Sequence, residues 1–257
     1  MAHGKRYRKQ LDKVQRTRAY LPAEAVALIK ETASAGFDET VELHLRLGVN
    51  VRHAEEQLRG TLALPHGLGK DVTVAVFAEG QQARDAEAAG ADFVGGQDLA
   101  EKVQEGWTNF DVAISTPAMM KTVGQLGRVL GPQGKMPNPK VGTVTDDVEK
   151  AVGESKSGKV EYRTDRQAIV HMTIGKASFE EQKLLDNYMA VVDEIVRAKP
   201  SSSKGKYILS ATLTTTMGPG VKVDASKTKE RDAGEATPEA VEATEEKAET
   251  AEEPATA

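Results

Sequence analysis

The sequence predicts an α/β protein with two domains. Near both chain ends, apolar residues alternate with polar ones as in antiparallel strands, and helical patterns flank these strands. In the middle of the chain, short apolar strands alternate with helices, which is typical of parallel β-α-β units. We therefore expect a terminal α+β domain, with an antiparallel sheet and helices built from both chain ends, and an inserted doubly wound, Rossmann-like parallel α/β domain. The expected ranges are residues 1–67 and 159–228 for the terminal domain, 68–158 for the inserted domain and 229–257 for an acidic tail.

The first part of the chain predicts two helices and two strands. Residues 5–18 and 22–35 show helical spacing of apolar residues, and Pro22 suits the start of the second helix. In residues 41–47, every second residue is valine or leucine, which predicts a strand with one buried and one solvated face. Residues 60–65 predict a second strand, which leads into a glycine-rich turn.

The middle of the chain predicts three strands, at residues 71–78, 92–95 and 110–115, which alternate with helices at residues 80–91 and 97–107. Doubly wound domains often bind ligands at the carboxyl ends of their strands. The first of these strands is not followed by a G-x-G-x-x-G pattern, so the sequence indicates no cofactor.

After a loop rich in glycine and proline, the chain returns to the terminal domain. The predicted elements are a helix at residues 145–154, a hairpin of strands at 159–164 and 168–175, a long helix up to residue 197 and a strand at 207–217. Ser178 and Glu181 match a capping box at the start of the long helix. The two chain crossings between the domains, near residues 65–70 and Gly158, are expected to act as a hinge.

Composition narrows the class of protein. The 257 residues include no cysteine, which excludes disulfides and thiolate metal sites. The start of the chain carries charge without the apolar core of a signal peptide, and no stretch is long enough to span a membrane. We therefore expect a cytoplasmic protein with no membrane partner. The five histidines show no metal-ligand spacing, so no metal is expected either.

The net charge of −5 hides a strong segregation of charge along the chain. Residues 233–257 hold eight glutamates and one lysine, so residues 1–232 carry +2. We expect the tail to be disordered, because it has too few apolar residues to offset the entropy of ordering. The first twenty residues are strongly basic, which suits a polyanion, although a solvated amphipathic helix would carry the same charge.

The loop at residues 125–145 carries cations and no carboxylate. A phosphate-cradling nucleotide loop would need a glycine in place of Val129 and a serine or threonine in place of Met136, so that pattern is not met. No catalytic constellation stands out elsewhere, and the residues alone favour a nucleic-acid-binding module over a small-molecule-binding α/β domain, and both over an enzyme.

The same loop belongs to a set of stretches that together resemble a known family. The longest is "GQLGRVLGPQGKMPNPKVGTVT" at residues 124–145. The others are "HGKRYR", "FDETVELHLRLGV", "RGTLALPHGLGK", "GADFVGG", "GKASF" and "TTTMGPG". In this order they resemble the bacterial L-one family of the large ribosomal subunit. The resemblance covers about residues 3–225 and leaves out the acidic tail.

This resemblance implies the fold described above and a role in translation. It implies a structural protein that binds large-subunit ribosomal RNA, forms the mobile stalk beside the exit site and assists the release of deacylated transfer RNA. It also implies a translational repressor that binds its own operon messenger RNA. The protein would be monomeric when free, part of the ribosome in the cytoplasm, and not an enzyme.

Carried over position by position, the family's RNA surface falls on two distant stretches and the strand that follows the first. The positions are Phe37, Thr40, Arg46, Thr215, Thr216, Met217 and Gly218. Lys5, Arg6 and Arg8 would support them by contacting phosphates. Phe37 would pack against RNA, and the Thr-Met-Gly turn would press its backbone onto riboses. Gly36 and Gln133 stand where the family commonly has lysine and arginine, which weakens the expected attraction for phosphate there.

Two interpretations of the loop at residues 125–145 remain open. Its prolines fix φ and its glycines permit tight turns, which favours a rigid structural lobe. Alternatively, Arg128, Lys135 and Lys140 form a secondary contact to RNA, including transfer RNA. For the whole chain, the alternative function is a small-molecule-binding α/β protein with a generic basic surface.

Overall fold

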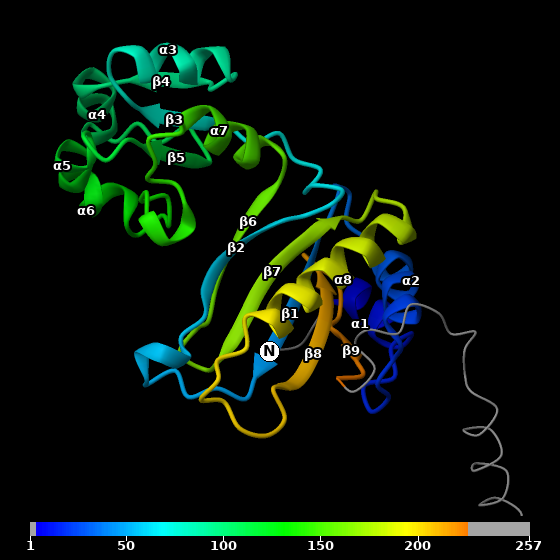
Figure 1. The fold of residues 1–257 in the computed structure, drawn as a ribbon. Helices are drawn as coiled ribbons and strands as arrows, with labels where there is room; N and C mark the ends of the chain where they lie inside the picture. Colours follow the sequence, from blue (N-terminus) through cyan, green and yellow to red (C-terminus); the bar gives the residue numbers. More distant parts are fainter. Residues whose placement is uncertain (1–3, 226–257) are drawn as a thin grey trace, which may run out of the picture.

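The computed structural model describes residues 4–225, and the tail expected at residues 229–257 lies outside them. The chain folds into two lobes that are joined by a two-stranded ribbon (Figure 1). The terminal lobe contains a four-stranded sheet in the order β7-β1-β8-β9, and the inserted lobe contains a three-stranded sheet in the order β4-β3-β5. This arrangement confirms the predicted fold class.

The sheet of the terminal lobe is antiparallel and combines segments from both parts of the chain. β1 (Thr40–Leu47) lies between β7 (Ile169–Lys176) and β8 (Ile208–Thr215), and β9 (Val221–Val223) pairs with the other side of β8. The valine and leucine residues that alternate in β1 are all buried. The polar residues between them therefore form an outer, solvated face, as the two-residue period predicts.

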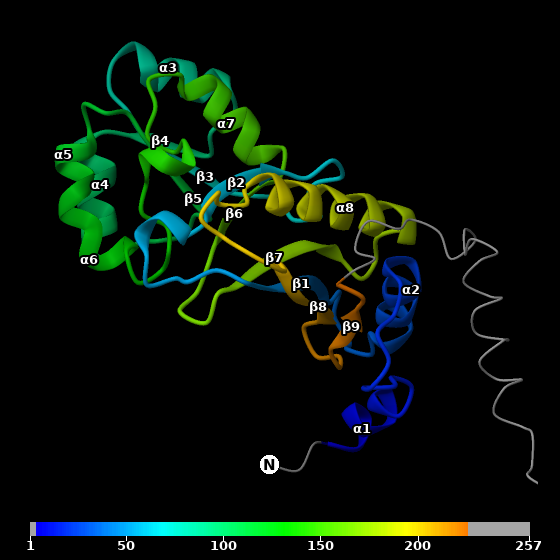
Figure 2. The ribbon, with the colours of Figure 1, turned by 60° about the horizontal axis from the view of Figure 1, so that its bottom comes forward.

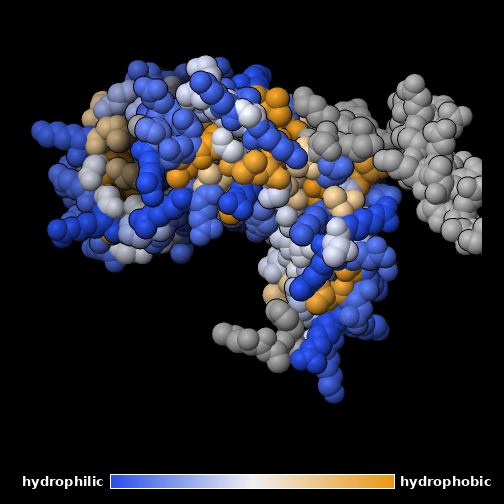
Figure 3. Space-filling view, turned by 90° about the horizontal axis from the view of Figure 1, so that it is seen from below, coloured by the Kyte–Doolittle hydropathy of each residue, from blue (hydrophilic) through white to orange (hydrophobic). Residues whose placement is uncertain are grey.

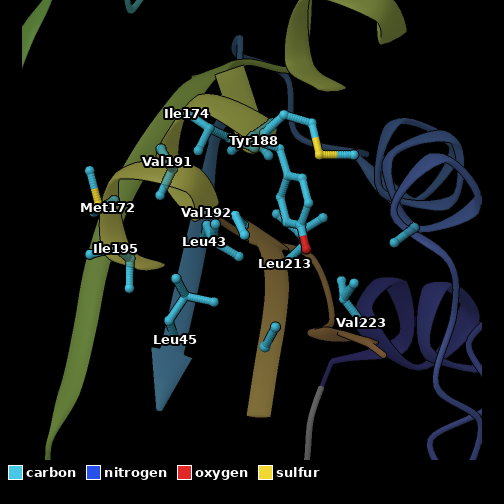
Figure 4. Packing of buried hydrophobic residues seen from close by; sticks show 14 of the residues in the cluster. Leu43, Leu45, Met172, Ile174, Tyr188, Val191, Val192, Ile195, Leu213 and Val223 are labelled. Carbon is cyan, nitrogen blue, oxygen red and sulfur yellow. The ribbon is translucent and has the colours of Figure 1, made fainter. Parts of the chain in front are cut away.

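Two helices cover the inner face of this sheet. α2 (Pro22–Thr32) has its proline at the first position, as predicted, and α8 (Glu181–Arg197) packs against α2 and β7. The buried residues of α8 recur with helical spacing, so one side of the helix joins the core. Figure 4 shows Tyr188 and Val192 of α8 packed over the sheet beside Leu43. Fully burying an apolar side chain of this size contributes about 2 kcal/mol to stability.

The first helix is shorter than predicted. α1 (Lys5–Leu11) ends well before residue 18, and none of its residues is buried. The backbone N–H of Gln15 instead donates to the hydroxyl of Tyr20, at 3.0 Å. This bond, between residues five apart in the chain, uses a group that a continued helix would need. Figure 2 shows α1 at the edge of the terminal lobe, on the side away from the inserted lobe.

The inserted lobe has a parallel sheet with helices on both faces. β3 (Val74–Phe77) lies between β4 (Phe93–Gly95) and β5 (Val112–Ser115). The helices are α3 (Gln81–Ala88), α4 (Gln97–Gln104), α5 (Met120–Val123), α6 (Gly127–Leu130) and α7 (Val148–Lys156). Alternate residues of β3 join two separate apolar clusters, one on each face of the sheet. Burial on both faces explains the continuous apolar run of β3.

The ribbon between the lobes consists of β2 (Arg59–Ala63) and β6 (Lys159–Arg163), which pair antiparallel. The predicted hairpin between β6 and β7 is reduced to one bridge, Thr164–Val170, because β6 pairs with β2 instead. Where the ribbon meets the inserted lobe, a Cβ on Gly158 would lie 2.7 Å from the Cα of Gly67. The two chain crossings are therefore in close contact. The hinge and the domain boundaries given above remain predictions.

Three further local features differ from what the sequence predicts. The capping box is wrong, because α8 begins after Glu180 without a side-chain cap, and the Ser178 hydroxyl donates to the carboxylate of Asp38, at 2.7 Å. The first part of the glycine- and proline-rich loop is helical and contains η2 (Gly124–Leu126) and α6. The short strand β9 was not predicted.

Within residues 4–225, no helix is both long enough and apolar enough to cross a membrane. Seen from below, the inserted lobe is mostly hydrophilic, and apolar residues gather near the centre of the molecule (Figure 3).

Candidate nucleic-acid interface

A buried carboxylate joins the two stretches in which the sequence places most of the RNA-binding residues. Glu39 is 1% exposed. Its Oε1 accepts hydrogen bonds from the backbone N–H groups of Ser34, at 2.9 Å, and Ala35, at 2.7 Å. Its Oε2 accepts one from the N–H of Met217, at 3.0 Å, 178 residues away in the chain. We call the loop at residues 34–40 and the turn at residues 215–218 the Glu39 end of the terminal lobe.

The environment of Glu39 keeps it ionised. Burial alone would raise the pKa of this carboxyl group, but the hydrogen bonds from the amides of Met217, Ala35 and Ser34 outweigh burial and hold the pKa below its usual value. The Thr215 hydroxyl lies beside the same carboxylate, although it does not reach hydrogen-bond geometry. We therefore attribute the lowered pKa mainly to the amides.

Two large apolar side chains are exposed at the Glu39 end. Phe37 is 56% exposed and Met217 is 62% exposed. Phe37 precedes Glu39 by two residues, and Met217 provides one of the amides that bind its carboxylate. An exposed aromatic ring on an ordered loop provides a flat surface for an unpaired base, and a thioether side chain adapts to irregular surfaces.

Backbone pairing continues from the sheet into the turn. The N–H of Thr40 donates to the Thr216 hydroxyl, at 3.0 Å, and the N–H of Thr216 donates to the carbonyl of Thr40, at 3.1 Å. Lys176 donates to the Thr40 hydroxyl, at 2.9 Å. A Cβ on Gly218 would lie 2.3 Å from the hydroxyl oxygen of Thr215, so this position has no room for a side chain. Thr215 is itself buried, which makes it a packing residue in this chain.

The basic helix α1 lies next to the Glu39 end. Lys5, Arg6 and Arg8 are exposed. The guanidinium group of Arg6 donates to the hydroxyl of Ser34, at 3.0 Å, and to the carbonyl oxygen of the same residue. Because Ser34 also binds Glu39, this contact places the cations of α1 beside the loop that carries Phe37. The structure thus brings together residues from three distant parts of the chain.

Arg46 and the three cations of the inserted lobe lie apart from this group. Arg46 is exposed near the opposite end of β1. Arg128 on α6 and Lys140 are also exposed. Lys135 is half-buried, donates to the carbonyl oxygen of Thr108 at 2.9 Å, and lies over a phenylalanine ring with its Nζ 5.3 Å from the ring centre. Lys135 therefore holds the loop together, whereas Arg128 and Lys140 are accessible from solvent.

A pair of histidines on the outer face of the sheet was not predicted. His44 and His171 face each other across β1 and β7, with their Nδ1 atoms 2.8 Å apart. Glu42 lies 3.6 Å from the Nε2 of His44, and Asp165 lies 3.6 Å from the Nε2 of His171. Burial and the charge of His171 lower the pKa of His44, while Glu42 opposes this change. The short distance requires one hydrogen between the two Nδ1 atoms.

Neither Glu39 nor the histidine pair was identified as a site from sequence. Glu39 stands inside the stretch "GFDET", among residues suited to RNA. A carboxylate would repel RNA if it were exposed there, which indicates that it is buried and hydrogen-bonded within the protein. The histidines occupy outward positions of two predicted strands, but the pairing of those strands was needed to bring them together. Within residues 4–225 no group of three or more histidine, aspartate or glutamate side chains is arranged to hold a metal ion.

A two-lobed α/β fold with exposed aromatic, thioether and cationic groups at one end has the features of a nucleic-acid-binding protein. The model of the Ribosomal protein L1p/L10e family matches residues 29–219, and the chain belongs to this family. It is 56% identical over 230 residues to the large ribosomal subunit protein uL1 of Thermobifida fusca, a match that covers 90% of this chain and 98% of the relative. It is 55% identical over 235 residues to the large ribosomal subunit protein uL1 of Beutenbergia cavernae, covering 91% and 99%. The predicted family is confirmed.

Proposed function

We propose that this chain is a structural, non-enzymatic component of the large ribosomal subunit in the cytoplasm and that its terminal lobe binds large-subunit ribosomal RNA. Family membership and the names of its relatives support the place in the ribosome. The main support for the RNA interface is the Glu39 end, where one buried carboxylate joins the loop that carries Phe37 to the turn that carries Met217, both exposed.

The chemistry of this end suits a folded RNA better than a regular duplex. Unpaired bases stack on exposed aromatic rings, and a backbone that approaches closely, as at Gly218, can contact ribose hydroxyl groups. The cations of α1 would neutralise nearby phosphates, which adds affinity without sequence preference. We therefore assign shape recognition to the residues around Glu39 and electrostatic attraction to Lys5, Arg6 and Arg8.

The finer roles follow from the family resemblance. We propose that the terminal lobe belongs to the mobile stalk beside the exit site, that the stalk contacts deacylated transfer RNA, and that the free monomer represses its own operon by binding the messenger RNA. The two-lobed form with a single ribbon between the lobes supports a mobile stalk. The exposed side chains of Arg128 and Lys140 support a secondary contact through the inserted lobe.

The test is a salt series. The full chain is titrated into a stalk-region fragment of large-subunit ribosomal RNA and, separately, into an unrelated hairpin of equal length. We expect the stalk fragment to stay bound at salt concentrations that abolish binding of the hairpin, because shape recognition adds to the salt-dependent part of the affinity. Equal binding of both RNAs, lost at the same salt concentration, would show that the basic surface is generic.

A further inference from the structure

Residues 5–18 form a strongly basic segment at the edge of the terminal lobe. They hold seven lysine or arginine side chains and one carboxylate, Asp12, so their side chains carry +6. Four of the seven cations lie on α1, none of whose residues is buried. We call residues 5–18 the basic segment. Its helix presents its cations to solvent and is not packed into the core of the lobe.

Most of the charge of the basic segment is not neutralised within the fold. Lys13 binds Glu31 at 2.8 Å, and Arg18 binds Glu24 at 3.0 Å. The side chains that make no ion pair with any of residues 4–225 are Lys5, Arg8, Lys9 and Arg16. Lys5 and Lys9 are four residues apart on α1, a spacing at which like charges destabilise a helix. An anionic partner would therefore stabilise this helix.

The described chain ends beside the basic segment. The N–H of Tyr20 donates to the carbonyl of Lys222, at 3.0 Å, and the N–H of Asp224 donates to the carbonyl of Tyr20, at 3.0 Å. The hydroxyl of Tyr20 in turn accepts the bond from Gln15 of the basic segment. Figures 1 and 2 both show β9 on the side of the terminal lobe that carries α1. The chain beyond β9 therefore continues from a point next to these cations.

The residues that follow have the opposite charge. Residues 233–257, which we call the acidic stretch, hold eight glutamates and one lysine and carry −7. The first of these glutamates, Glu235, is ten residues beyond Ala225, and ten residues can span about 33 Å. α1 has seven residues, so it is only about 10 Å long. The acidic stretch is therefore able to reach the basic segment, and the two charges nearly cancel.

We propose that the acidic stretch docks on the basic segment of its own chain and competes there with RNA. Both partners belong to one chain, so the contact forms at an effective concentration on the order of millimolar, even if each ion pair is weak. The proposal rests on the proposed RNA-binding function and adds a means of regulating it.

The position of the basic segment makes this competition selective. Arg6 binds the hydroxyl of Ser34, at 3.0 Å, in the loop that carries Phe37, so the basic segment borders the Glu39 end. An RNA that binds by charge alone has to displace the acidic stretch. An RNA that also fits the Glu39 end keeps its contacts with Phe37 and Met217 while the basic segment is covered. The acidic stretch therefore weakens nonspecific binding more than specific binding.

The first experiment tests the contact without RNA. The chain has no cysteine, so Thr250→Cys provides one attachment point for a nitroxide label in the full chain. We expect the label to broaden the amide NMR signals of residues 5–18 at low salt. The signals should recover at 1 M salt, where the Debye length is about 3 Å. They should also recover when the eight glutamates of the acidic stretch are changed to Gln. Broadening that misses residues 5–18, or that is stronger on another surface, would overturn the proposal.

The second experiment measures competition. The eight glutamates of the acidic stretch are changed to Gln in three full-length backgrounds. The first is the unmodified chain, and the second carries Gln at Lys5, Arg8 and Lys9. The third is a matched control with Gln at three exposed cations of the inserted lobe, Arg84, Lys102 and Lys121. Each protein is titrated with an unrelated hairpin and with the stalk fragment, and its melting temperature shows that it is folded.

We expect the neutral tail to raise affinity for the hairpin about tenfold in the unmodified chain and in the control. The gain should be less than twofold when Lys5, Arg8 and Lys9 are already Gln, because the docking surface is then lost. Affinity for the stalk fragment should rise less than threefold in the unmodified chain, because the contacts at the Glu39 end do not depend on the tail.

Two outcomes of the titrations would overturn the proposal. An equal gain in all three backgrounds would mean that the tail acts only through net charge, and no gain in any background would mean that it does not compete. Failure of the proposed function gives a different pattern. The stalk fragment would then bind no better than the hairpin with either tail, while the nitroxide label would still report the docked acidic stretch.

Discussion

The two ends of the terminal lobe are built by opposite means. At the Glu39 end, a buried carboxylate receives three backbone hydrogen bonds, two from its own loop and one from a residue 178 positions away. At the opposite end of the lobe, two segments that are ordered by local hydrogen bonds present Arg52 and Arg166 to solvent, beside the carboxylate of Asp165. A long-range contact therefore fixes the shape of one surface, whereas locally ordered loops are enough to present charge at the other.

The largest effect is expected from Glu39→Gln, which keeps the volume and removes the charge. The amide can replace only part of the acceptor capacity, so buried N–H groups lose their partner. We expect a loss of about 3 kcal/mol in the free energy of unfolding, measured by urea denaturation, since hydrogen bonds to charged groups contribute about 1.5 to 3 kcal/mol each. Affinity for the stalk fragment should fall at least tenfold.

The pH dependence of stability provides a second test of the role of Glu39. Because the pKa of Glu39 is lower in the folded chain than its ordinary value of 4.5, its charge stabilises the fold above that pH. The contribution is lost as the pH falls through the folded pKa. Glu39→Gln should remove this part of the acid-induced loss, and Glu31→Gln, a change of an exposed carboxylate, should not. Equal acid sensitivity of all three proteins would contradict the role given to Glu39.

An intermediate effect is expected from Phe37→Ala and Met217→Ala. Both side chains are mostly exposed, so the melting temperature should change little. Affinity for the stalk fragment should fall about tenfold for Phe37→Ala, because loss of an aromatic stacking partner costs about 1 to 3 kcal/mol per base. The matched control is Val196→Ala, an exposed apolar residue on α8. If both variants bind like the control, the RNA interface lies elsewhere.

The smallest effect concerns the histidine pair, which lies between the two ends. Burial and the charge of His171 lower the pKa of His44, so the folded chain takes up this proton less readily than the unfolded chain, in which it titrates near 6.5. Stability should therefore decrease as the pH falls below 6.5 towards the folded pKa of His44. His44→Gln should reduce this slope in urea denaturation, and His53→Gln, at an exposed histidine, should leave it unchanged. An unchanged slope in His44→Gln would show that the pair carries no linked proton.

Local patterns predicted most of the fold correctly. The two-residue period of β1 and the apolar run of β3 reflect burial, and the proline at the start of α2 reflects its fixed φ. All three predictions agree with the structure. Predictions failed where a tertiary contact or a contact within a loop replaces the expected local one. Ser178 was expected to cap a helix, but its hydroxyl binds Asp38, and the hydroxyl of Tyr20 binds an N–H at which the first helix was expected to continue.

At the candidate interface, the sequence likewise predicted single residues and not the contacts between segments. The resemblance pointed to Phe37 and Met217, and the structure adds the carboxylate that fixes both segments. It also shows Thr215 as a buried residue, although the sequence placed it on the RNA surface. The hollow that Arg52 and Arg163 line could not be predicted, because the pairing of β2 with β6 brings their segments together.

The class of fold, the order of the main elements, the family and the segregation of acidic and basic residues follow from the sequence, because each is written in local periodicity or in contiguous stretches. Which strand β6 joins, and that Glu39 binds the amide of Met217, follow from contacts made in the folded chain. The strands β2 and β6 are about a hundred residues apart in the chain, and Glu39 and Met217 are 178 residues apart. The free energies of these contacts depend on burial and hydrogen-bond geometry in the folded lobe, and no single stretch of the sequence specifies either.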